Sequence, residues 1–190
     1  KSLKSCVNLH VLIEITPSSK NANILNLDSL PAGKCLVTPE ELLTETDYSF
    51  LNPFFNGVAS IHFVIHDHPT GVSLRTLKTA RTVRKYIKQF SPDAIHFEGF
   101  TLRTLALAPL MLQIKKTSLS VHDAVLHSGE KTWKSTLPRF IFFNAPVRKS
   151  FIFYSQFSRN QFFLNNSKRK WKLIVTRMFQ FLAGEEMQGI

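Results

Sequence analysis

Short runs of β-forming residues alternate with helical patterns along this chain, and that alternation limits the possible folds more than any other feature. Clear strands are predicted at residues 59–65 (ASIHFVI) and 94–97 (AIHF). Between them, residues 73–90 place apolar side chains three or four positions apart, which predicts an amphipathic helix. Ser91 and Pro92 end this helix, because proline disfavours helical geometry in the residue before it. A strand, a helix and a strand in this order predict an α/β fold with a parallel sheet.

The same alternation continues on both sides of this unit. Further strands are predicted at residues 7–15, 35–38, 118–121, 151–154 and 171–175. Further helices are predicted at residues 102–114 and 155–163, and residues 132–150 are predicted to be mostly helical. Pro39 is expected at the first helical position of another helix, with Thr38 as its N-cap. Pro109 is expected to kink the helix at residues 102–114.

The composition supports a packed domain. Of the 190 residues, 44% are hydrophobic, which is enough for a substantial core in one domain. There are 17 phenylalanines, so many rings must lie in that core and some can serve an interface. The two cysteines, Cys6 and Cys35, form no metal-binding or disulfide-rich pattern, which favours a reducing compartment. No signal peptide is recognised at Lys1, and the first apolar run is too short to span a bilayer.

Polar residues collect where the predicted strands end. In parallel sheets ligands bind outside the carboxyl ends of the strands, so these residues are site candidates. Histidine exchanges protons near neutral pH, glycine allows close backbone approach, and a serine that starts a helix leaves N–H groups for ligand oxygens. Any one of them alone is more simply explained as a polar loop residue. The set comprises His66, Asp67, His68, His96, Glu98, Gly99, His122, Asp123, His127, Ser128, Gly129, Glu130, Ser155, Ser158 and Arg159.

Three of these segments resemble motifs of the family-4 retaining glycosyltransferases, which have the GT-B fold. They are residues 92–99 (PDAIHFEG), 118–130 (SLSVHDAVLHSGE) and 151–159 (FIFYSQFSR). The resemblance covers about residues 59–177. It implies that residues 1–177 form the N-terminal, acceptor-side half of the enzyme, a Rossmann-like three-layer α/β/α domain with a mainly parallel sheet. Residues 178–190 are then a tail or an interdomain linker.

The resemblance also implies an activity. Such enzymes transfer a sugar from a nucleotide-sugar donor to a glycan, lipid-linked or polysaccharide acceptor, with retention at the anomeric carbon. His122 and Asp123 match residues of the catalytic cleft. The residues that match acceptor- or substrate-binding positions are Glu98, Gly99, His127, Ser128, Gly129, Glu130 and Ser155. No metal and no other cofactor is expected, because the nucleotide sugar is a substrate.

The chain departs from the family pattern in two places. Family members usually carry a glycine-rich loop after the first strand, whereas Ile15 is followed by the sequence TPSSK. We therefore carry over no site residue there. The donor-binding domain is not contained in the sequence, so the donor is expected to bind through a C-terminal domain or a partner chain. This half alone is expected to be inactive.

The charge of the chain favours an anionic partner. The formal net charge is +11 and the sequence pI is about 9.9. The helix at residues 73–90 has no acidic residue and carries the basic residues Arg75, Lys78, Arg81, Arg84, Lys85 and Lys88. All of these except Arg84 are assigned to a basic patch that faces the membrane and rests on anionic headgroups. The alternative is that the apolar side of this helix packs on the sheet and its charged side chains are only solvated. The expected location is the cytoplasm, with peripheral binding to the inner membrane face if the patch meets lipid.

The histidines and the charge of the chain each suggest another function. A metal-dependent hydrolase could use His62, His66, Asp67, His68 and His122, since histidine and aspartate ligate zinc. Their spacing, however, fits no established zinc motif. The charge alone would also suit a nucleic-acid-binding module, but the sequence has no reader motif and its aromatic residues are not interleaved with the basic runs. No nucleic-acid partner is expected.

Overall fold

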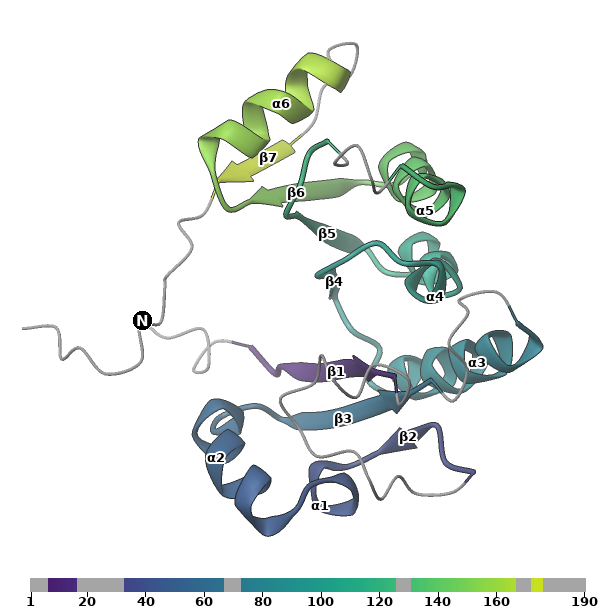
Figure 1. Ribbon diagram of the computed structural model, residues 1–190, viewed down its shortest axis with the longest axis vertical. Helices are drawn as coiled ribbons and strands as arrows, with labels where there is room; N and C mark the ends of the chain where they lie inside the picture. The colour runs from purple at the N-terminus through teal and green to yellow at the C-terminus, as the bar shows by residue number, and fades with distance from the viewer. Residues whose placement is uncertain (1–6, 17–32, 67–72, 126–130, 167–171, 176–190) are drawn as a thin grey trace, which may run out of the picture. The chain divides into compact units, whose positions relative to one another are not determined.

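The computed structural model describes residues 7–16, 33–66, 73–125, 131–166 and 172–175 (Figure 1). The chain divides into two compact units. Unit 1 comprises residues 1–92 with 105–107, and unit 2 comprises residues 93–104 with 108–190. Each unit contains a sheet whose strands alternate with helices, so the α/β fold predicted from the sequence is confirmed.

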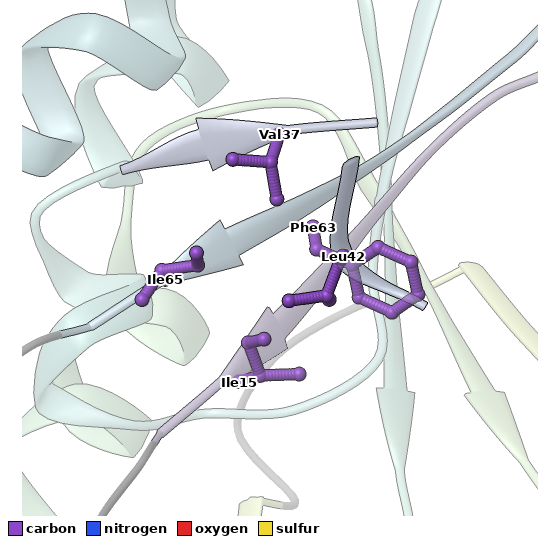
Figure 2. Packing of buried hydrophobic residues seen from close by; sticks show 5 residues of the cluster. All are labelled: Ile15, Val37, Leu42, Phe63 and Ile65. Atoms are coloured by element: carbon purple, nitrogen blue, oxygen red, sulfur yellow. The ribbon is translucent and has the colours of Figure 1, made fainter. Parts of the chain in front are cut away.

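Unit 1 has a mixed three-stranded sheet in the order β1-β3-β2. Strands β1 (His10–Ile15) and β3 (Ser60–Ile65) are parallel, and β2 (Leu36–Val37) is antiparallel to β3. The helices are α1 (Pro39–Leu42), α2 (Glu45–Phe55) and α3 (Leu74–Gln89). One core cluster joins all three strands to α1, as Figure 2 shows for Ile15, Val37, Leu42, Phe63 and Ile65.

The predicted helix starts of unit 1 are confirmed. Pro39 is the first residue of α1, and the backbone N–H of the N-cap Thr38 donates to a carboxylate oxygen of Glu41 at 3.0 Å. The hydroxyl of Ser73 accepts from the backbone N–H of Thr76 at 3.0 Å and caps α3. The buried face of α3 comprises Thr76, Thr79, Ala80 and Val83.

Unit 2 has a parallel four-stranded sheet in the order β4-β5-β6-β7. The strands are β4 (Ala94–Phe97), β5 (Lys116–Val121), β6 (Lys149–Phe153) and β7 (Lys172–Val175). Along the chain they are separated by α4 (Leu102–Leu105), the 3₁₀ helix η3 (Ala108–Leu112), α5 (Trp133–Asn144) and α6 (Gln156–Asn166). The described ranges contain no helix with the length and apolar character needed to cross a membrane.

The core of unit 2 is built from phenylalanine rings. Alternate residues of a strand point to opposite faces, and the register places Phe97, Leu119 and Phe151 in one row of the sheet. Helix α5 adds Phe142 to this face, and the centroids of the Phe142 and Phe97 rings lie 5.1 Å apart. Helix α6 adds Phe162, whose ring lies 4.9 Å from that of Phe151. Phenylalanine rings therefore form much of the packing between the unit 2 sheet and the helices α5 and α6.

One helix prediction in unit 2 was wrong, and proline explains it. Residues 102–114 do not form one kinked helix, because α4 ends at Leu105 and Pro109 lies in the separate helix η3. Residues 132–150 are mostly helical, as predicted, with α5 ending at Asn144 and β6 beginning at Lys149. Ala145 precedes a proline and adopts φ −51° and ψ 132°, outside the helical region.

Lys149 joins the end of α5 to the start of β6. Its side chain is buried, with 6% exposure, and Nζ donates to the carbonyl oxygens of Phe142 at 2.7 Å and Ala145 at 2.8 Å. Carbonyls at the end of a helix have no partner within the helix, and a cation there also interacts favourably with the helix dipole. This lysine therefore acts as the C-terminal cap of α5.

We expect Lys149→Met to lower the free energy of unfolding by about 1–3 kcal/mol, because the substitution leaves buried carbonyls without a donor. Urea denaturation followed by circular dichroism measures the change. The exposed neighbour Arg148 supplies the control, since Arg148→Met should change stability by less than about 0.5 kcal/mol. Equal stability of the two variants would contradict the capping role.

Candidate functional site

Polar side chains gather on one face of the unit 2 sheet, toward the carboxyl ends of three strands. The register pairs His96 of β4 with Ser118 of β5, so these two side chains share a face. Residues two positions further along each strand continue on that face. The resulting group, which we name the Glu98 cluster, comprises His96, Glu98, Ser118, Ser120, His122 and Tyr154.

The carboxylate of Glu98 is the centre of this cluster. Its Oε1 accepts from the hydroxyl of Tyr154 and lies 2.9 Å from Nε2 of His122. Its Oε2 accepts from the hydroxyl of Ser120 at 2.9 Å and lies 2.8 Å from Nε2 of His96. An ionised carboxylate offers about four acceptor positions, so these donors occupy them. Glu98 therefore holds together side chains from β4, β5 and the residue after β6.

The hydrogen bonds keep Glu98 ionised at neutral pH. Burial alone would raise the pKa of the carboxyl group, but the bonds from Tyr154, His96 and Ser120 outweigh it and lower the pKa below its ordinary value of 4.5. The pKa of Tyr154 is raised, first by burial and then by its bond to Glu98. At neutral pH the tyrosine therefore keeps the proton that it donates to the carboxylate.

This arrangement fixes which nitrogen of His122 carries the proton. Nε2 faces the Glu98 carboxylate at 2.9 Å and the backbone carbonyl oxygen of Glu98 at 3.1 Å. A nitrogen between two acceptors must donate, so the neutral ring has its lone pair on Nδ1. The ring packs beside that of Tyr154, with centroids 4.8 Å apart, and its side chain is 50% exposed. His122 thus offers a hydrogen-bond acceptor or weak base to a ligand.

Ser158 and Ser155 position the backbone around His122. The hydroxyl of Ser158, which is buried, donates to the carbonyl oxygen of His122 at 2.8 Å. The hydroxyl of Ser155 accepts from the backbone N–H of Ser158 at 3.1 Å, as an N-cap of α6 does. Ser155 therefore caps α6, and its role in substrate binding stays a prediction.

The other predicted site residues lie at varying distance from this network. Asp123 is exposed directly after His122, and its backbone carbonyl oxygen accepts from Arg139 at 2.5 Å. A side chain at Gly99 would meet open space, so packing does not demand glycine there. The residues His127, Ser128, Gly129 and Glu130 lie outside the described residues. Their roles, and those of Asp123 and Gly99, stay predictions.

Sequence reasoning did not select Ser120 and Tyr154 as site residues. Both have a signal in the sequence: Ser120 lies in β5 two positions before His122, which directly follows that strand, and Tyr154 directly follows β6. Strand periodicity would have placed them beside His122. Their contact with Glu98, however, depends on which residues of β4, β5 and β6 pair.

Of the residues proposed for a hydrolase, His122 lies in the Glu98 cluster of unit 2, whereas His62 belongs to a hydrogen-bond network in unit 1. Nδ1 of His62 lies 2.9 Å from the hydroxyl of Tyr86, which lies 3.2 Å from the hydroxyl of Ser60. Ser60 in turn lies 2.7 Å from Nδ1 of His10. His66 is buried, with Nε2 3.8 Å from a carboxylate oxygen of Glu14. Asp67 and His68 lie outside the described residues.

An open pocket of about 760 Å³ also lies in unit 1, at the amino end of β3. Its lining includes Tyr48, Asn52 and Asn56 of the α2 region and His62 of β3. The pKa of His62 is lowered, mainly by burial, so the ring is neutral at pH 7. Among the residues that the structure describes, no group of three or more histidine, cysteine, aspartate or glutamate side chains is arranged to hold a metal ion.

Comparison with known proteins found no matching family model, no matching curated protein and no matching solved structure.

The lowered pKa of Glu98 predicts an acid-sensitive unit 2. The unfolded chain takes up this proton near pH 4.5, whereas the folded chain takes it up only at lower pH, so acid favours the unfolded state. The stabilising contribution is complete above pH 4.5 and is lost as the pH falls through the folded pKa. We expect Glu98→Gln to flatten this part of the stability profile, measured by urea denaturation at about pH 7 and about pH 4. An identical acid-induced loss in both proteins would show that Glu98 does not contribute.

Proposed function

We propose that this chain is the acceptor-binding, N-terminal domain of a retaining glycosyltransferase, with a Rossmann-like three-layer α/β/α architecture and a mainly parallel sheet. The whole enzyme transfers a sugar from a nucleotide-sugar donor to a glycan, lipid-linked or polysaccharide acceptor. The observation that carries this proposal is the Glu98 cluster, which presents an oriented, half-exposed His122 beyond a parallel strand. Glu98 and His122 come from two of the segments that resemble the enzyme family.

The residues of the cluster suit the recognition of sugar hydroxyls. Nδ1 of His122 accepts a hydrogen bond from a hydroxyl of the substrate, while Nε2–H stays bound to Glu98. A carboxylate behind an imidazole holds the ring in place and fixes its tautomer. The ionised Glu98 also adds negative potential near a sugar ring that gains positive charge as its bond to the donor breaks. The nucleotide of the donor binds through a C-terminal domain or a partner chain, and no metal is required.

A transfer assay tests the proposal. The whole protein that contains this chain is incubated with each of a set of nucleotide sugars and with lipid-linked or polysaccharide acceptors. Mass spectrometry detects the product, and NMR of the anomeric proton reports its configuration. We expect one donor to give a product with retained configuration. Absence of transfer combined with tightly bound zinc would favour a hydrolase, and absence of transfer combined with salt-sensitive oligonucleotide binding would favour a nucleic-acid-binding protein.

The basic face of α3 supports a second part of the proposal, that the enzyme works at an anionic membrane. All of the predicted patch residues, Arg75, Lys78, Arg81, Lys85 and Lys88, are exposed. At the start of the helix, Leu74 and Leu77 are also exposed, at 85% and 57%. The helix therefore offers cations and apolar side chains together, as helices that bind lipid surfaces do.

Charge reversal tests this part. We expect the variant with Arg81→Glu, Lys85→Glu and Lys88→Glu to bind anionic vesicles at least about tenfold more weakly, since each basic residue near such a surface contributes about 1 kcal/mol. Co-sedimentation with vesicles that contain phosphatidylglycerol measures the binding. The matched control reverses Lys115 and Lys116, which are exposed in unit 2. Unchanged binding of the α3 variant would mean that these charges are only solvated.

A further inference from the structure

An exposed apolar stripe runs along α5 in unit 2. Trp133, Leu137 and Phe140 lie at spacings of four and three residues, which places them on one side of the helix. Their exposures are 58%, 39% and 64%. The opposite side of α5 packs on the sheet through Phe142, which is fully buried. Large apolar side chains that remain exposed on a helix already anchored to a core indicate an interaction surface.

The charge around this stripe indicates what binds there. Residues 131–166 contain no aspartate or glutamate and have six basic residues: Lys131, Lys134, Arg139, Arg148, Lys149 and Arg159. Lys131 and Lys134 flank Trp133 and are exposed. Tryptophan and lysine are both favoured where apolar and charged environments meet, because each has an apolar body and a polar end. Cations beside exposed aromatic rings complement the surface of a lipid bilayer, which has anionic headgroups outside and apolar acyl chains beneath them.

We propose that α5 binds anionic lipid bilayers, with Trp133, Leu137 and Phe140 entering the headgroup region and Lys131 and Lys134 contacting lipid phosphates. This surface lies on α5 of unit 2, whereas the basic face lies on α3 of unit 1, and its three large apolar side chains add insertion to charge attraction. Its binding should therefore persist in part at high salt, where purely electrostatic attraction is screened. The inference does not depend on sugar transfer, because it rests only on the exposed residues of unit 2.

Tryptophan fluorescence tests the insertion directly. The chain has two tryptophans, so Trp171→Phe leaves Trp133 as the only emitter. We expect its emission to shift to shorter wavelength on addition of phosphatidylcholine–phosphatidylglycerol vesicles, and to be quenched by lipids with brominated acyl chains. Unchanged emission from protein that sediments with the vesicles would overturn the proposal, since binding would then use another surface.

Substitution tests the energetic contribution of the stripe. The variant with Trp133→Ser, Leu137→Ser and Phe140→Ser should lose roughly tenfold or more of its partition into anionic vesicles, mainly in the part that resists salt. The matched control is Phe50→Ser, which removes a phenylalanine with 63% exposure from α2 of unit 1. Equal losses in both proteins would overturn the proposal. So would a triple variant that binds vesicles normally but no longer self-associates, which would identify a second copy as the partner.

Discussion

Replacing His122 by alanine is expected to lower the rate of sugar transfer by the whole protein about 10²–10³-fold, the range typical for loss of a positioned proton acceptor. The reason is that Nε2 of this half-exposed ring is held by Glu98, which leaves Nδ1 as the proton acceptor in the proposed reaction. The side chain is half-exposed, so its removal should leave the fold of unit 2 intact. Initial transfer rates, together with circular dichroism and thermal unfolding, separate the two effects.

Two further variants make the experiment specific. Glu98→Gln keeps the imidazole but removes the charge that holds its Nε2–H, so transfer should fall roughly 10–100-fold, as for other residues that orient a functional histidine. Nitrogen chemical shifts of His122 should then show a mixture of tautomers. Asp93→Ala changes an exposed polar residue that precedes the first residue of β4, at the end of the strand opposite Glu98. This variant should leave transfer unchanged. Near-normal turnover of His122→Ala would refute the assigned role.

Replacing Phe162 by alanine is expected to lower the free energy of unfolding by about 3–5 kcal/mol, as removal of a buried aromatic side chain does. Phe162 is fully buried, and its ring lies 5.2 Å from that of Phe143, 4.9 Å from Phe151 and 5.3 Å from Phe153. The substitution therefore opens a cavity where α6 meets β6. Urea denaturation, followed by the loss of helical signal, measures the effect.

Phe157 is the matched control, because it lies on the same helix with 73% exposure. Phe157→Ala should change stability by less than about 0.5 kcal/mol. If Phe162→Ala were as stable as this control, the aromatic contacts of α6 would not contribute to the core of unit 2.

Much of the secondary structure could be predicted because its signals are local. The spacing of Leu74, Leu77, Ala80 and Val83 predicted α3 to within one residue at each end. The predicted strand at residues 94–97 coincides with β4. By contrast, the sequence patterns did not predict α2, and they gave no sign that β2 pairs antiparallel to β3. The direction of pairing depends on how the connecting chain returns to the sheet, which a strand's own residues do not encode.

The candidate site was predictable only in part, for a related reason. Glu98 and His122 follow adjacent parallel strands. Ligand sites in such sheets lie at the carboxyl ends of the strands, so the sequence alone placed both residues in one predicted site. Tyr154 reaches Glu98 across 56 positions of the chain, and Ser120 reaches it across 22. Whether such residues touch depends on register, because a shift of one residue would turn each side chain to the opposite face.

The two faces of the unit 2 sheet have a consequence for how this protein tolerates change. In β4, β5 and β6 the register aligns even-numbered residues on the face of the Glu98 cluster, and odd-numbered residues on the face that packs against phenylalanine rings. Under the proposed function, substitutions at even positions would alter which acceptor binds, whereas substitutions at odd positions alter how tightly the helices pack. The parity of a position along the strand would then separate specificity from stability, so that the acceptor preference could diverge without its interior being rebuilt.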